Sequence, residues 1–256
     1  MDHTPVHLPV LHWGRQDAPR RVLLLHGLTS AAACWWYVAD ELARAGWSVT
    51  AADLRGHGLA PRTRRYDIGG FVADVLALRP PARPDGTAAW DLVVGHSLGG
   101  LVTTGAASAA PDWADRLLLL DPVIAVPEEA VEGFVGALSE EVRNTDPEAM
   151  LRENPEWHPE DAFLKAQAAR RTSTYVVESV LRGNAPWSYE QALAAYPHPV
   201  TVLAADPDRG AVFSAEQGRR IEEARTGFRW SVVKGAGHAV YRDNPDAVVA
   251  AALESP

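Results

Sequence analysis

The chain carries a serine between two glycines at the end of a run of buried-strand residues, in the stretch DLVVGHSLGG (residues 91–100). The apolar residues 92–94 are typical of a strand covered on both faces, and the small residues after Ser97 predict a helix. Ser97 therefore lies at a strand-to-helix corner, where Gly95 and Gly99 allow a tight turn. Parallel sheets bind ligands at this edge, so the pattern predicts an exposed, reactive serine. The alternative is an ordinary turn with an incidental serine.

Strand and helix patterns alternate along most of the chain. Apolar strand patterns occur at residues 21–25, 48–52, 90–95, 117–120, 200–204 and 228–233. Helical patterns occur between or after them, at residues 33–45, 68–78, 98–110, 214–224 and 246–253. This alternation predicts an α/β fold, with a mostly parallel central sheet and helices on both faces. The proline-rich stretch 79–86 predicts a turn-rich linker.

Residues 123–196 break this rhythm, because they contain no convincing buried strand. Their pattern is helical and rich in aromatic residues, and several prolines divide it into short helices. An insertion of this length at a strand end predicts a helical lid over a binding site. Residues 1–122 and 197–256 would then form the core. The alternative is that these helices only complete the fold.

Composition and charge exclude several classes of protein. The formal net charge of −9 argues against nucleic-acid binding, which normally needs a basic surface. The single cysteine, Cys34, excludes an internal disulfide and fits a reducing compartment. We see no signal-peptide pattern and no apolar run of membrane-spanning length, so we expect a cytoplasmic protein without a membrane partner. No metal-ligand spacing or glycine-rich nucleotide loop is visible, so we expect neither a metal nor a cofactor.

A serine nucleophile needs a histidine to take its proton and a carboxylate to hold that histidine in the right tautomer. Of the nine histidines, His238 is the best candidate, because it follows the strand pattern 228–233 and the turn Gly-Ala-Gly. A tight loop would present its side chain just past a strand end. His96 adjoins Ser97, and we expect it to face away from the serine.

Four separated motifs carry a resemblance to a known family: LLLHGLTS, DLRGHG, GHSLGG and GAGH. In their order and spacing the sequence resembles the α/β-hydrolase superfamily, in its branch of capped serine esterases, lactonases and carbon–carbon bond hydrolases. The resemblance implies a catalytic triad in the order serine, acid, histidine, with Ser97 as nucleophile and His238 as base. It also implies the α/β-hydrolase fold, with the helical lid inserted after the sixth strand.

The resemblance places the acid after the strand that precedes the histidine's strand, in the stretch VTVLAADPDRG. Relatives commonly show a glycine there and the acid three residues later. Ala205 takes the place of the glycine, so Asp208 falls on the acid position and is preferred. Asp206 stays a candidate, because the departure from glycine leaves the choice open. Asp121, at the end of the strand pattern before the insertion, is a third candidate, since a minority of hydrolases carry the acid there.

The alkoxide formed by attack on a carbonyl needs two preorganised N–H donors, the oxyanion hole. One is expected at the backbone N–H of Leu98, directly after the nucleophile at a helix start. The resemblance places the other at Leu28. It also implies that His26 orients neighbouring loops, and that Arg55 and His57 brace their own loop without touching substrate.

Trp36, Trp157 and Trp187 are predicted to bind substrate, and the aromatic insertion favours a small apolar molecule. Trp36 could instead pack the first helix against the sheet. The default function is hydrolysis of a carboxylic ester, lactone or thioester. Carbon–carbon bond hydrolysis, acyl transfer and perhydrolysis use the same triad, and a non-catalytic binding protein is a further alternative. The sequence leaves the oligomeric state open.

Overall fold

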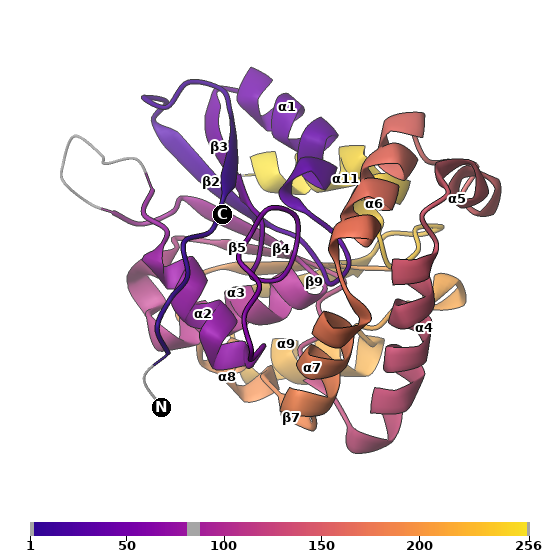
Figure 1. Cartoon of the computed structure of the whole chain (residues 1–256). Helices are drawn as coiled ribbons and strands as arrows, with labels where there is room; N and C mark the ends of the chain where they lie inside the picture. The colour runs from indigo at the N-terminus through magenta and orange to yellow at the C-terminus, as the bar shows by residue number, and fades with distance from the viewer. Residues whose placement is uncertain (1–2, 81–87, 255–256) are drawn as a thin grey trace.

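The computed structural model of the chain describes residues 3–80 and 88–254, so most of the expected linker at 79–86 lies outside the described residues. Its central feature is a seven-stranded sheet in the order β1-β3-β2-β4-β5-β8-β9 (Figure 1). Strand β1 runs antiparallel to β3, and the other neighbours are parallel. The strands are β1 (Val10–Trp13), β2 (Arg20–Leu25), β3 (Trp47–Ala52), β4 (Leu92–His96), β5 (Leu117–Leu120), β8 (Val200–Ala204) and β9 (Phe228–Val232).

The inner strands are apolar on both faces because helices cover both faces of the sheet. In β2, Leu23 and Leu25 pack into one hydrophobic cluster, whereas Val22 and Leu24 pack into the other. The four leucines of β5 divide between the same two clusters. The alternation along each strand therefore separates two buried faces rather than a buried face from a solvated one.

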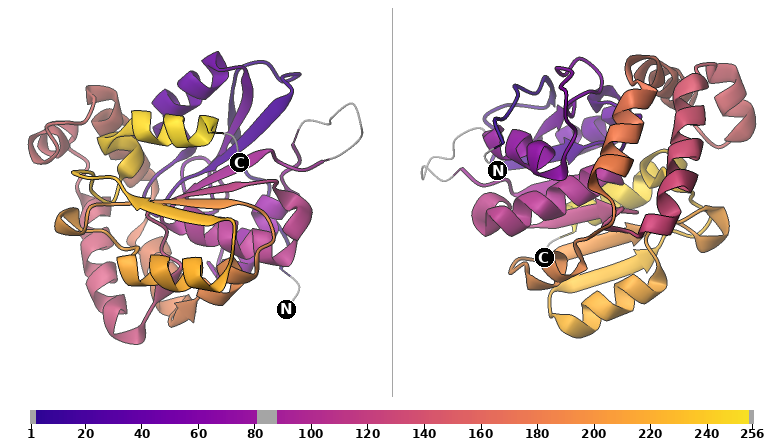
Figure 2. Two further views of the ribbon diagram at one scale, coloured as in Figure 1. Left: turned by 180° about the vertical axis from the view of Figure 1, so that it is seen from behind. Right: turned by 60° about the horizontal axis from the view of Figure 1, so that its bottom comes forward.

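Two helical layers enclose the sheet, as the views in Figure 2 show. One layer contains α1 (Trp36–Arg44) and α11 (Pro245–Leu253), which follows the short α10 (Val240–Asp243). The opposite layer contains α2 (Ile68–Ala77), α3 (Leu98–Ala109) and α9 (Ala215–Ala224). Short 3₁₀ turns lie at η1 (Ala32–Trp35), η2 (Pro111–Trp113), η3 (Glu128–Ala130) and η4 (Pro207–Arg209). This is the α/β architecture that the alternating patterns predict.

The segment 123–196 is mainly helical, as expected, but it follows β5, the fifth strand of the described chain, rather than a sixth strand. It contains β6 (Ala125–Val126), α4 (Val131–Arg143), α5 (Pro147–Glu153), α6 (Pro159–Arg171), α7 (Thr174–Asn184), β7 (Trp187–Ser188) and α8 (Glu190–Ala195). Helices α4 to α7 gather at one side of the sheet in Figure 1, whereas α8 packs against α3 and α9 of the core. The division into core and lid at residues 122 and 197 stays a prediction. Among the described residues, no helix is both long and apolar enough to cross a bilayer.

The register of the parallel strands brings several chain ends to one edge of the sheet. Leu25 pairs with Gly95, His96 pairs with Leu120, and Leu120 pairs with Leu203. The residues that directly follow β2, β4, β5 and β8 therefore lie side by side. These segments carry the side chains that the sequence singles out for chemistry.

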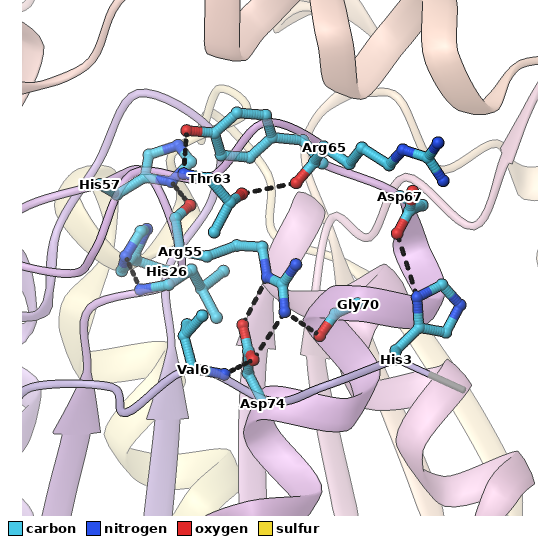
Figure 3. Close-up of polar contacts among 12 residues, drawn as sticks. His3, Val6, His26, Arg55, His57, Thr63, Arg65, Asp67, Gly70 and Asp74 are labelled. Atoms are coloured by element: carbon cyan, nitrogen blue, oxygen red, sulfur yellow. Dashed lines mark hydrogen bonds and ion pairs between the residues drawn. The ribbon is translucent and has the colours of Figure 1, made fainter. Parts of the chain in front are cut away.

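A buried polar cluster fixes the loop after β3 at this edge (Figure 3). The Arg55 guanidinium donates to both carboxylate oxygens of Asp74, at 2.6 and 2.7 Å, and to the carbonyl of Gly70 at 2.8 Å. His26 Nε2 accepts the Leu54 N–H at 3.0 Å, and His57 Nδ1 donates to the Arg55 carbonyl at 3.0 Å. The structure thus agrees with the expectation that His26, Arg55 and His57 brace loops.

This cluster predicts a loss of stability in acid. Burial lowers the pKa of His26 to about 4 and that of His57 to about 3, against a value near 6.5 in the unfolded chain. The unfolded chain then binds more protons below pH 6.5, so the free energy of unfolding falls as the pH drops from 6.5 to 4. Each ring contributes up to about 1.4 kcal/mol per pH unit to this slope.

The His57→Asn variant tests this slope, because an asparagine amide can replace the Nδ1 donor but does not titrate. Urea unfolding between pH 7 and pH 4 should give a slope that, below about pH 6, is lower than that of the wild type by up to about 1.4 kcal/mol per pH unit. An unchanged slope would show that His57 is already protonated in the fold.

Candidate active site

Ser97 lies on a strained corner between β4 and α3. Its backbone has φ 52° and ψ −115°, a conformation that residues other than glycine rarely adopt, and its N–H donates to the Leu120 carbonyl at 3.1 Å. A Cβ at Gly95 would lie 2.6 Å from the Gly99 carbonyl oxygen, and one at Gly99 would lie 2.2 Å from that of Leu25. The two glycines are thus required by close backbone approach, as the pattern predicts.

Asp121 holds His238 from the end of β5. The Nδ1–H of His238 donates to Asp121 Oδ2 at 2.6 Å, which leaves Nε2 as the nitrogen free to accept a proton. Asp121 has no exposed surface, and its carboxylate also accepts the backbone N–H groups of Ala205, Val212 and Phe213 at 3.0–3.2 Å. With four donors on its two oxygens, the carboxylate is fixed in place as an acceptor.

This pairing corrects the choice of acid. The preference for Asp208, and for Asp206 after it, is wrong: neither carboxylate contacts His238, and the third candidate, Asp121, does. Asp208 lies exposed in the turn η4. Asp206 accepts the N–H groups of Gly235, at 2.8 Å, and of Asp208, at 3.1 Å, and these bonds lower the pKa of its carboxyl. Asp206 therefore fastens the turn that precedes His238.

His96 supports the same histidine loop, because its ring lies against His238, and its expected orientation away from Ser97 stays a prediction. Its Nε2–H donates to the His238 carbonyl at 2.8 Å, and the two rings lie 4.8 Å apart between centroids. Burial lowers the pKa of His96 well below its usual range, so the ring stays neutral and acts only as this donor. Its position directly before Ser97 was the only sequence signal for this role.

Two backbone N–H groups near Ser97 lack acceptors. Among the described residues, the N–H groups of Leu28 and Leu98 make no hydrogen bond. Both residues line the same cavity as Ser97 and His238, and a Cβ at Gly27 would lie 3.0 Å from that of Ser97. This arrangement matches the pair of donors that the sequence predicts for an oxyanion.

Two cavities meet at the serine, and both are lined by Leu28, Ser97, Leu138 and His238. The first, about 190 Å³, has apolar walls from α3, α4, α7 and the segments beside them: Leu101, Val123, Phe134, Val180, Leu181 and Trp187. The second, about 310 Å³, is polar, with walls that include Glu141, Asn154, Lys165, Arg209, Arg242 and Asp243. The Ser97 hydroxyl makes no hydrogen bond among the described residues, and such bonds often form only with substrate present.

A family model for the alpha/beta hydrolase family matches residues 22–252. The chain belongs to this family. The match covers the sheet from within β2 onward, the corner at Ser97 and the histidine loop, so the expected superfamily and fold are confirmed.

Several relatives of this alpha/beta hydrolase are named as hydrolases. Lipase LipV of Mycobacterium tuberculosis is 35% identical over 133 residues, which cover 52% of this chain and 48% of that protein. The chain thus spans about half the length of this relative. N-formylmaleamate deformylase of Pseudomonas putida is 24% identical over 237 residues, covering 90% of this chain and 86% of that protein.

Solved structures give the same fold. The N-formylmaleamic acid deformylase of Pseudomonas putida has a TM-score of 0.78 at 23% identity, covering 96% of this chain and 95% of its own. The enol-lactonase of Burkholderia xenovorans has a TM-score of 0.75 at 19% identity, covering 96% and 94%. At this level of identity the likeness establishes the fold alone.

The three tryptophans predicted to bind substrate have different positions in this alpha/beta hydrolase. Trp187 lines the apolar cavity and donates to the Val123 carbonyl at 3.0 Å, whereas Trp157 lines the polar cavity. Trp36 lines neither; its indole N–H donates to Asp161 at 2.9 Å, which ties α1 to α6. The structure thereby corrects the assignment of Trp36. Within residues 3–80 and 88–254, no cluster of three or more potential metal ligands occurs.

Proposed function

We propose that this protein is a serine hydrolase that cleaves a carboxylic ester, or a related acyl bond, through an acyl-enzyme. The observation that carries the proposal is the strained corner that presents Ser97 beside His238, whose Nδ1–H is held by the buried Asp121. Aspartate-nucleophile hydrolases of this fold, such as epoxide hydrolases, would need a carboxylate at position 97. A purely binding protein would not need a base fixed beside the serine.

The geometry supports a sequence of proton and electron movements. His238 Nε2 takes the proton of the Ser97 hydroxyl as the oxygen attacks the carbonyl carbon, and Asp121 stabilises the imidazolium that forms. The N–H groups of Leu28 and Leu98 bind the oxyanion, and the amino terminus of α3 adds a favourable dipole. The imidazolium then protonates the leaving group. Water, activated by the same histidine, releases the acyl group from Ser97.

The relatives support the chemistry at a coarse level. The lipase favours an ester, and the deformylase, matched over 90% of this chain, favours removal of a formyl group as a second candidate. Both reactions require the same nucleophile and the same pair of N–H donors. Transfer of the acyl group to another acceptor would use the same acyl-enzyme.

A substrate panel and a covalent probe test this proposal together. The panel contains p-nitrophenyl esters of increasing chain length, a lactone, a thioester and an N-formyl amide. A fluorophosphonate should label one serine, and peptide mass spectrometry should locate the label at Ser97. Turnover of no panel member combined with absence of labelling would favour a binding protein. Labelling at a different serine would overturn the assigned site.

The apolar cavity predicts a preference that depends on Trp187. Trp187 is 9% exposed and forms part of the cavity wall, so Trp187→Ala removes apolar contact with the acyl chain. The ratio of kcat/KM for p-nitrophenyl hexanoate to that for the acetate should fall by about 10- to 100-fold, the range expected for a few lost methylene contacts.

Trp36→Ala is the matched control for this prediction, since Trp36 lines neither cavity. We expect the hexanoate-to-acetate ratio of this variant to stay at the wild-type value. If both variants lower the ratio equally, the effect comes from general disruption of the insertion rather than from the cavity wall.

A further inference from the structure

We propose that the polar cavity binds a carboxylate of the substrate, held by Arg242, so that the enzyme acts on acyl compounds that carry one negative charge. This inference rests on the proposed function and narrows its substrate class. It revises the expectation of an entirely apolar substrate, because only one of the two cavities at Ser97 has apolar walls.

Arg242 is a buried cation without a carboxylate partner. Its side chain is on α10, is 5% exposed, and lines the polar cavity. Within the described part of the chain, no carboxylate lies at ion-pair distance from it, and its Nε has no hydrogen-bond acceptor, although the Cys34 thiol is near. Asp161 interacts with the guanidinium electrostatically without reaching ion-pair distance, so a ligand carboxylate can supply the direct partner that a buried charge normally has.

Neighbouring side chains fix the guanidinium in the cavity wall. Its Nη2 donates to Ser30 Oγ at 3.1 Å, and its carbon lies 4.6 Å from the centre of the Tyr241 ring and 5.1 Å from that of Trp157. Aromatic faces orient an arginine without neutralising it. Nε is fully enclosed, but Nη1 donates to none of the described residues and therefore stays available for an oxygen of a carboxylate.

The other charges of the cavity are already satisfied by protein groups. Lys165 Nζ donates to Glu141 at 3.0 Å and to the Thr29 side chain at 2.6 Å. Arg209 pairs with Glu156 at 2.8 Å.

The carboxylate of Asp243 does not replace the missing partner of Arg242. It accepts the N–H groups of Trp157 and Gly237, one on each oxygen. Among the cations of this wall, Arg242 is the one that the described residues leave without an acidic partner.

The charges of the cavity wall favour a ligand with a single negative charge. The wall carries three cations, Lys165, Arg209 and Arg242, and two carboxylates, Glu141 and Asp243, so it has a formal excess of one positive charge. A single carboxylate balances this excess, whereas a dianion such as phosphate would leave the cavity with an excess of negative charge. Since Ser97 and His238 lie at the junction of both cavities, the carbonyl under attack would separate a carboxylate-bearing arm from an apolar one.

Paired substrates test the inference. The wild type should hydrolyse p-nitrophenyl hemiglutarate with a kcat/KM at least about ten times that for the uncharged pentanoate of similar length, as expected for a charge-assisted hydrogen bond. A second pair, 4-acetoxybenzoate and phenyl acetate, places the charge on the leaving group. A preference for the acidic member of either pair supports the proposal, and a preference for the neutral member of both overturns it.

The Arg242→Gln variant should lower the acidic-to-neutral ratio of kcat/KM by about 10- to 100-fold, whereas Arg242→Lys should keep part of it. Arg209→Gln is the matched control, because it removes a cation of the same cavity that is already paired, and it should retain the ratio. Equal ratios in the wild type and Arg242→Gln would overturn the assignment. If Arg242→Gln does not fold, the comparison of the wild type with Arg242→Lys decides.

Binding without turnover separates this inference from the proposed function. Monomethyl glutarate should bind to the Ser97→Ala protein in calorimetry, and inorganic phosphate should not displace it. Binding together with failure of every hydrolysis assay would contradict the proposed function but support the carboxylate site. Hydrolysis of neutral esters without any binding of monomethyl glutarate would contradict the carboxylate site alone. Displacement by phosphate would overturn its selectivity for one charge.

Discussion

Replacing Ser97 with alanine is expected to lower kcat/KM for an activated ester by about four powers of ten or more. The change removes the oxygen that would form the acyl-enzyme, while the N–H donors of Leu28 and Leu98 remain and leave only a small residual rate. Burst-phase and steady-state assays with p-nitrophenyl butanoate measure the effect. The burst of the first turnover should disappear together with fluorophosphonate labelling.

Two controls make this result specific. Alanine has a Cβ as serine does, so the strain at φ 52° is unchanged and the melting temperature should stay close to that of the wild type. A variant that keeps more than about one per cent of wild-type kcat/KM would exclude Ser97 as the nucleophile, since loss of a nucleophile costs far more than this.

Asp121→Asn is expected to lower kcat by about four powers of ten, far more than the same change at Asp206 or Asp208. An asparagine oxygen can still accept the N–H groups of Ala205 and Phe213, but its amide would then face the His238 ring with a donor. His238 would turn to the other tautomer, which places the proton on Nε2 and removes the base. Steady-state kinetics of all three variants on one ester provide the comparison.

The two other aspartates serve as matched controls for the acid. Asp208→Asn should stay within about twofold of the wild type, since the exposed side chain contacts nothing in the site. Asp206→Asn should cost less than about tenfold, because the amide keeps one acceptor for the turn before His238. A larger loss of activity in either variant than in Asp121→Asn would show that the acid that orients His238 is in the loop after β8.

The sequence alone determined the fold class and two members of the candidate triad. Buried strands covered on both faces appear in the sequence as continuous apolar runs. Because a helix connects most pairs of consecutive strands, the strands are expected to run parallel in the sheet. The corner at Ser97 could be predicted from the sequence, because a tight backbone crossing admits only glycine at positions 95 and 99. His238 could be predicted for a similar local reason, since it comes directly after a strand and a turn that contains glycines. In each case a few consecutive residues carry the signal.

The tertiary structure decided what depends on segments far apart in the chain. Asp121 and Asp206 follow adjacent strands at the same edge of the sheet, so the sequence alone leaves both as candidates for the acid that orients His238. Only the path of the backbone after β8 distinguishes them, because it turns the N–H groups of Val212 and Phe213 toward Asp121 and directs Asp206 to Gly235. Likewise, Arg242 of α10 lines the polar cavity together with side chains of α4 and α6. No local pattern encodes such a cavity, since its charge and shape arise only when these helices pack around Ser97.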